Sequence, residues 1–178
     1  MATLNSTTFN VSINGSTSSP NDAGGGSVAP GKQSITVSES TSYSDGTGTA
    51  KAEDFFADRR TIATGANDDI DLSGGLENQF GETLTMTGVK LIMIVNQDTV
   101  NSLQVNNAVT NGWFGADTPF VASGDAITIK PGGRWVMEAP SGTGYEVTAG
   151  TKDILRITHD GTDSNSADYD IYILPEVA

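Results

Sequence analysis

The first 57 residues differ in composition from the rest of the chain, and this difference most constrains what the chain can fold into. Residues 1–30 consist mainly of Ser, Thr, Asn, Gly and Ala, with Asp22 as the one charged side chain. A segment of this composition buries too little apolar surface to offset the entropy lost when it becomes ordered. We therefore expect residues 1–57 to form an extended, low-complexity arm and residues 58–178 to form the folded body.

The arm nevertheless contains two short stretches with the pattern of a β-strand. Phe9, Val11 and Ile13 alternate with polar residues, and so do Ile35 and Val37. A period of two residues is typical of a half-buried strand. We predict that these five side chains are interface residues, and that the arm becomes ordered by adding its strands to sheet edges of another protein.

The body has the composition of a β protein. The chain contains 21 glycines and many Ser and Thr residues, and the body shows about nine short apolar segments separated by turn residues, with no amphipathic helix. The strongest segment, residues 82–96, predicts a strand that bends at Gly88 and is buried on both faces beyond it. Residues 52–58 are expected to form one short helical turn. The fold class predicted is all-β: an antiparallel β-sandwich, jelly-roll or immunoglobulin-like, with an extended N-terminal arm.

The net charge argues against two classes of partner. The formal charge is −13, from nine basic and 22 acidic residues, and residues 58–178 hold 17 of the acids and seven of the bases. Nucleic-acid binding depends on basic side chains that neutralise phosphates, and anionic membranes repel acidic proteins in the same way. We expect neither a nucleic acid nor a membrane as a partner, and the acidic body indicates a solvated outer surface.

The sequence offers little for catalysis. His159 is the lone histidine, and it lies beside the turn residues Asp160 and Gly161, where we expect it to be a surface residue. A nucleophile–base pair would need this histidine near a serine and an aspartate, and no Gly-x-Ser-x-Gly motif is present. We predict that the protein is not an enzyme and that it binds no cofactor.

An acidic turn is the nearest approach to a metal site. Asp160, Asp163 and Asn165 supply oxygen ligands of the kind that Ca²⁺ prefers. The turn lacks the ligand spacing and the closing glutamate of an EF-hand. We expect ordinary turn chemistry and no metal here, with these three residues as the weak candidates.

Three aromatic residues lie in a long loop, residues 109–125, where large apolar side chains are unusual. Trp113, Phe114 and Phe120 have three open interpretations: they cap the core of the sandwich, contact another subunit, or stack on a sugar. We include them among the predicted interface residues.

Several stretches of the body, in their order along the chain, resemble a known family. They are residues 57–81, Gly88-Val-Lys-Leu-Ile-Met-Ile-Val-Asn96, Lys130-Pro-Gly-Gly133, Ala139-Pro140, Gly144-Tyr-Glu-Val-Thr-Ala-Gly150 and Asp153-Ile-Leu-Arg-Ile157. This order resembles the head decoration (cement) proteins of tailed bacteriophages. The resemblance covers about residues 55–178, and the arm has no counterpart in it.

The resemblance implies a β-rich knob on the outer surface of a virion capsid. Proteins of this type typically form homotrimers and lock neighbouring copies of the major capsid protein together. The implied partners are therefore the major capsid protein and further copies of this chain. A tail or fibre component and a carbohydrate-binding β-sandwich module are the alternatives that the sequence leaves open.

Overall fold

A computed structural model describes residues 4–18, 32–161 and 164–178. This part of the chain contains thirteen strands and no helix, and therefore no helix of the length and apolarity needed to cross a membrane. The strands are β1 (Ser6–Ser18), β2 (Lys32–Asp45), β3 (Lys51–Ala52), β4 (Phe56–Ile62), β5 (Asn67–Asp71), β6 (Ser73–Glu77), β7 (Thr83–Asn96), β8 (Leu103–Asn107), β9 (Ala126–Ile129), β10 (Arg134–Glu138), β11 (Tyr145–Glu146), β12 (Ile154–His159) and β13 (Ala167–Val177).

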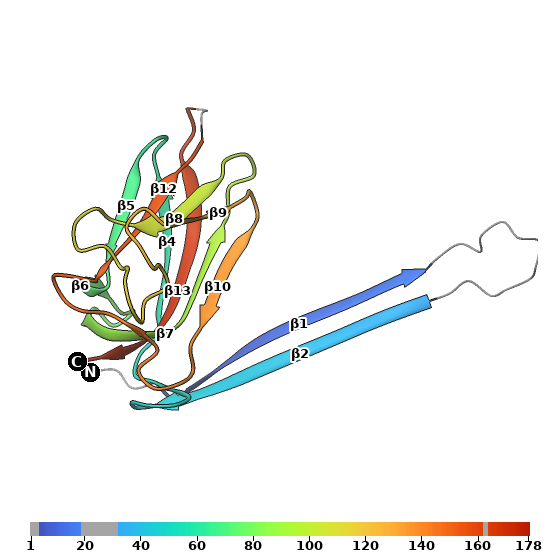
Figure 1. Cartoon of the computed structure of the whole chain (residues 1–178), viewed down its shortest axis with the longest axis horizontal. Coiled ribbons are helices and arrows are strands. Elements are labelled where there is room, and N and C mark those ends of the chain that lie inside the picture. Colours follow the sequence, from blue (N-terminus) through green and yellow to red (C-terminus); the bar gives the residue numbers. More distant parts are fainter. Residues whose placement is uncertain (1–3, 19–31, 162–163) are drawn as a thin grey trace, which may run out of the picture. The chain divides into compact units, whose positions relative to one another are not determined.

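The body is a β-sandwich, as the sequence predicts (Figure 1). One sheet has the strand order β10-β7-β13-β4, with β6 and β11 also paired to β7, and the other has the order β5-β12-β8-β9. The paired strands of these two sheets run antiparallel. The all-β antiparallel class is thereby confirmed.

The core lies between the two sheets and follows from side-chain alternation. In β12, Leu155 and Ile157 are fully buried while their neighbours are only partly buried. Ile92 and Ile94 of β7 and Ile171 of β13 meet them from the six-stranded sheet. Because alternate residues of a strand point to opposite faces, each strand supplies every second side chain to this core.

Strand β7 changes its burial pattern at Gly88, as predicted, although its second half is not fully buried on both faces. Its first half alternates between exposed and buried residues, and its second half is buried on nearly every residue. A Cβ atom at Gly88 would lie 2.0 Å from the carbonyl oxygen of Thr143, so only glycine allows this close approach of two backbones. In the second half, β13 and β10 flank β7 within the sheet, and Met93 and Val95 on its outer face stay partly exposed.

The predicted helical turn over residues 52–58 is wrong. Residues 51–52 form β3, and β4 begins at Phe56, which is paired with Ile173 of β13. Pairing with β13 continues along the whole of β4. This long-range pairing satisfies the backbone of the segment, and a local helical preference of a few residues cannot compete with it.

The chain divides into two compact units, residues 7–42 and the rest of the described chain. In the first unit β1 and β2 pair side by side and run antiparallel (Figure 1). We call this pair the ribbon. Its strands are longer than the two predicted stretches, because the Ser- and Thr-rich flanks also take the extended conformation. The two stretches are thus already paired with each other in this structure.

Candidate functional site

The ribbon has one apolar and one polar face. Thr8 Oγ1 and Ser42 Oγ lie 3.2 Å apart, so positions 8 and 42 share a face. Because side chains alternate along a strand, the odd-numbered residues of both strands share the opposite face. That face carries the five apolar residues predicted to form an interface: Phe9, Val11, Ile13, Ile35 and Val37.

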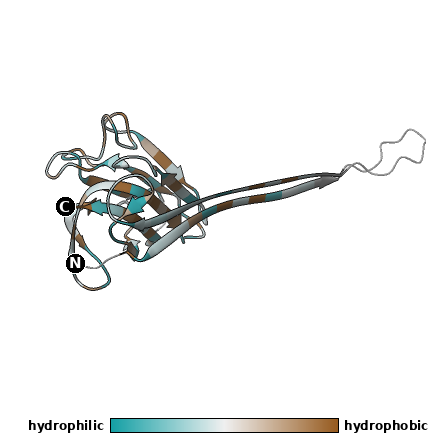
Figure 2. Cartoon of the chain, turned by 90° about the horizontal axis from the view of Figure 1, so that it is seen from below, coloured by the Kyte–Doolittle hydropathy of each residue, from teal (hydrophilic) through white to brown (hydrophobic). Residues whose placement is uncertain are grey.

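These apolar side chains are largely uncovered. Ile13 is 62% exposed and Ile35 is 55% exposed, while Val11 and Val37 are 42% and 43% exposed; Phe9 is half-buried. In Figure 2, brown hydrophobic bands interrupt the paler polar stretches of both strands of the ribbon. A two-stranded ribbon is at best marginally stable in water and needs packing against its apolar face. The face therefore has the properties of a docking surface.

The outer edge of β1 is a second feature suited to docking. In its sheet β1 is paired only with β2, so its other edge presents unpaired backbone N–H and C=O groups. Proteins usually protect such edges with charged residues or proline. Residues 6–18 contain neither. The edge strands β4 and β5 of the body, by contrast, carry charged residues such as Arg59, Asp68 and Asp69.

The residues that follow the ribbon, from Tyr43 onward, are bonded to the body by side-chain and backbone hydrogen bonds. Tyr43 is fully buried, and its hydroxyl donates to Glu138 Oε1 at 2.8 Å. Burial and this hydrogen bond raise the pKa of Tyr43 well above its usual value. Ser44 and Asp45 then pair with β3, which fixes the backbone that follows.

A buried ion pair completes this anchor. Lys90 Nζ lies 3.0 Å from Glu176 Oε1 and donates to the carbonyl oxygens of Gly48, at 2.9 Å, and Gly142. Glu176 Oε1 also accepts the backbone N–H of Gly48 at 2.8 Å. The loop after β2 is thereby bonded to two charges that water does not reach. We call residues 43–54 the anchor segment.

The three loop aromatics lie in or against the core. Trp113 is fully buried, donates its Nε1–H to the carbonyl oxygen of Glu146 at 2.7 Å, and contacts the Tyr145 ring edge to face. Phe120 is 3% exposed and stacks on Trp135, with ring centroids 6.0 Å apart, while Phe114 is partly buried against the core. The core-cap interpretation therefore describes them, and Trp113 and Phe120 do not belong to an exposed interface in this structure.

The acidic turn gathers no metal ligands in the part that the structure describes. Asp160 and Asn165 are exposed, and Asp163 lies outside the described residues. The backbone carbonyl of Asn165 accepts the Thr64 hydroxyl at 2.6 Å, which joins this turn to the loop between β4 and β5. Among the described residues no cluster of three His, Cys, Asp or Glu side chains could hold a metal ion.

His159 is buried, contrary to the expectation that it lies on the surface. It is 2% exposed, because it ends β12 with its side chain on the core-facing side of that strand. Its Nδ1 accepts the backbone N–H of Gly161 at 2.9 Å. The imidazole thus closes a tight turn.

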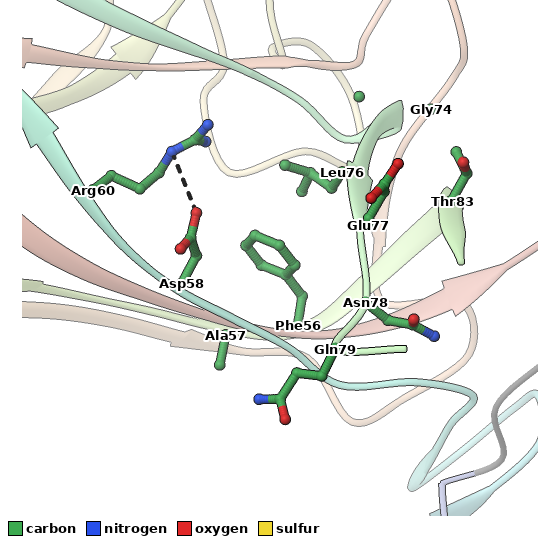
Figure 3. A pocket seen from close by; sticks show the side chains of 11 residues that line it. Phe56, Ala57, Asp58, Arg60, Gly74, Leu76, Glu77, Asn78, Gln79 and Thr83 are labelled. Atoms are coloured by element: carbon green, nitrogen blue, oxygen red, sulfur yellow. Dashed lines mark ion pairs between the residues drawn. The ribbon is translucent and has the colours of Figure 1, made fainter. Parts of the chain in front are cut away.

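A polar hollow of about 460 Å³ lies beside β4 and β6 (Figure 3). Arg60 points toward Asp58 at one side of the hollow, with Nε 3.7 Å from Oδ2, and also pairs with Asp68 at 3.1 Å. Asn78 Nδ2 donates to Asp54 and Glu82. Arg60 thus links β4 to β5, and Asn78 links the residues after β6 to the residues before β4.

No motif or pattern in the sequence predicts a role for Glu39 of the ribbon or for Arg134 of β10. Both are charged and exposed, and neither forms an ion pair within the described residues. Glu39 shares a strand face with Val37, and Arg134 shares a strand face with Val136, because residues two apart in a strand point the same way. A count of charges along the sequence does not reveal this placement.

Comparisons with known proteins do not assign the chain to a family. No protein-family model matches it, and no curated protein matches it.

Proposed function

We propose that the protein is a structural component of a bacteriophage particle, which binds the outer surface of the capsid and cements neighbouring major capsid subunits. The observation that carries the proposal is the open edge of β1, thirteen residues long and without charge or proline. Such an edge adds a strand to a partner sheet, where main-chain hydrogen bonds give affinity and alternate side chains give specificity.

The rest of the molecule supports this function. The anchor segment, which follows the ribbon in the chain, is bonded to the rest of the body through Tyr43 and Glu176. The acidic body suits a surface that faces water and keeps particles apart. Repeated copies around an oligomer raise the effective concentration of each weak contact. A homotrimer, as the resemblance implies, is the assembly that we propose.

A carbohydrate-binding module is less well supported. Sugar binding would need exposed aromatic rings, and the loop residues Trp113 and Phe120 are buried instead. A tail or fibre component would use the same open edge of β1. The two proposals therefore differ in where the protein lies in the particle, on the tail or on the capsid. Electron cryomicroscopy of the particle with labelled protein would show density on the head if the proposal holds, and density on the tail if it fails.

Strand addition is tested by placing lysines on the free edge of the ribbon. The variant Asn10→Lys with Asn14→Lys puts two positive charges on the polar face of β1. A matched control, Ser38→Lys with Ser40→Lys, puts them on the same face of β2. Binding is measured by cosedimentation with capsids of the encoding phage that lack this protein. We expect at least tenfold weaker binding for the β1 variant only; equal binding by both variants and the unmodified chain would show that β1 does not dock.

A further inference from the structure

The outer face of the six-stranded sheet, which points away from the core, is apolar along one row. Directly paired residues share a face, and the register aligns Ala57, Tyr172, Met93 and Val136 across β4, β13, β7 and β10. All four are partly exposed. The row beside it, with Leu91 and Leu174, is already buried. One apolar row of this sheet is thus left without full cover in the described chain.

The next row is polar but largely satisfied. Arg59 binds both carboxylate oxygens of Asp170, at 2.6 and 2.9 Å, and Gln97 donates to the same carboxylate at 2.6 Å. Val95 and Arg134 complete the row on β7 and β10. Among the described residues of this row, Arg134 therefore carries the charge that forms no ion pair.

Arg134 stands out among the basic residues of the body. Five of the seven, Arg59, Arg60, Lys90, Lys152 and Arg156, form ion pairs with acids. Lys130 and Arg134 form none within the described residues, and both are exposed, at the two ends of the turn between β9 and β10. In a chain of net charge −13, this is a local positive site.

The apolar face of the ribbon matches this surface in pattern and charge. Glu39 lies on that face, two residues from Val37, and it forms no ion pair within the described part of the chain. Arg134 likewise lies two residues from Val136 on one face of β10. Positions i and i+2 of a strand are about 7 Å apart in both cases. One alignment therefore brings valine against valine and carboxylate against guanidinium.

We propose that the apolar face of the ribbon of one copy packs on the outer face of the β10-β7-β13-β4 sheet of a second copy, with Glu39 of one copy paired to Arg134 of the other. Two sheets that pack face to face lie about 10 Å apart and interdigitate their side chains. This contact uses the face of the ribbon, while the proposed capsid contact uses the β1 edge. Self-association and capsid binding can therefore fail independently.

Charge reversal tests the ion pair. Glu39→Arg and Arg134→Glu are made singly and together, and the mass in solution is measured by light scattering over a range of concentrations. We expect the unmodified chain to associate, each single variant to associate at least tenfold more weakly, and the double variant to recover. Lys130→Glu, which makes the same charge change four residues before Arg134, is the control and should associate normally. A chain that is monomeric at about 100 μM, or single variants that associate like the unmodified chain, would overturn the proposal.

Cross-linking tests which copy provides the ribbon. The chain contains no cysteine, so Val37→Cys and Val136→Cys variants carry one thiol each and no background. Disulfides across two packed sheets are sterically feasible. An oxidised mixture of the two single variants should give a reducible dimer, and a mixture of Ser38→Cys with Val136→Cys should not, because Ser38 lies on the polar face. A third variant carries both Val37→Cys and Val136→Cys. If a disulfide forms within this double variant and none forms in the mixture of single variants, the ribbon covers its own body and the proposal is contradicted.

Discussion

Lys90 and Glu176 form an ion pair in the interior of the body, with Nζ 3.0 Å from Oε1 and side chains that are 0% and 5% exposed. Both charges are also bonded to the backbone of Gly48, in the loop that follows β2. Isolated charges in such a place would cost several kcal/mol each, so their mutual contact and these backbone bonds are what make the arrangement tolerable. The pair fixes the anchor segment to β7 and β13.

Replacing Lys90 by methionine should therefore destabilise the fold strongly. The change leaves the Glu176 carboxylate buried without a cation, and breaking a buried pair from one side costs about 3–5 kcal/mol. Lys152 and Glu146 provide the control, because their ion pair has the same 3.0 Å distance but side chains that are 31% and 45% exposed. Lys152→Met should cost less than about 1 kcal/mol. Urea unfolding measures both; similar losses in the two variants would contradict this account of Lys90.

Trp113 should contribute to stability and be hidden from solvent. Trp113→Phe removes buried ring volume and the donor to the carbonyl oxygen of Glu146, so we expect a loss of about 2–4 kcal/mol. Phe80→Ala, at an aromatic residue that is 80% exposed, should change stability by less than about 0.5 kcal/mol.

In a Trp135→Phe background, acrylamide should quench the remaining Trp113 fluorescence poorly. Efficient quenching there would mean that the loop opens and that the ring is available to a ligand.

The patterning of the sequence was enough to predict the sandwich and one face of the ribbon. Period-two alternation identified Phe9, Val11, Ile13, Ile35 and Val37, and the structure brings them to a common face. Whether residues of β1 and β2 share a face depends on how the two strands align, and the Thr8–Ser42 contact shows this alignment. Alternation within either strand alone cannot give it.

Residues in irregular segments were harder to place from the sequence. Trp113 and Phe120 lie in a loop with no periodicity, so nothing in the sequence distinguishes a ring that folds into the core from one that faces outward. His159 is buried because its own strand happens to end on an inward position. The unpaired state of Arg134 depends on sheet register, which places it beside Val95. These features are set by tertiary pairing.

Stability should fall in acid as the Asp170 carboxylate is protonated. The hydrogen bonds from Arg59 hold the pKa of Asp170 below its usual value; burial opposes this effect and the bond from Gln97 adds to it. A group whose pKa is lowered by folding stabilises the fold above its unfolded pKa, near about 4, and this contribution disappears as the pH falls through the folded pKa. The difference in stability between the unmodified chain and Asp170→Asn should thus be largest at neutral pH and shrink below about pH 4.

The control for this pH dependence is Asp160→Asn, which removes the same charge from an exposed turn. Chemical unfolding of the three proteins at several values between pH 2.5 and 7 measures the effect. Asp160→Asn should follow the unmodified chain throughout. Parallel curves for Asp170→Asn and the unmodified chain would show that the Arg59–Asp170 pair adds nothing to folding.

The bend of β7 should not tolerate a side chain at Gly88. The Cβ atom of alanine would lie 2.0 Å from the carbonyl oxygen of Thr143, and because the neighbour is backbone, it can yield only if the 141–144 loop moves. We expect Gly88→Ala to cost about 1–3 kcal/mol in urea unfolding, as overpacking in a core does. Gly15→Ala in β1 is the matched control, because no atom lies within 4 Å of the added Cβ. If Gly88→Ala is as stable as Gly15→Ala, the close approach of the two backbones is not what requires glycine here, and the bend must follow from the register shifts between β7 and β13 alone.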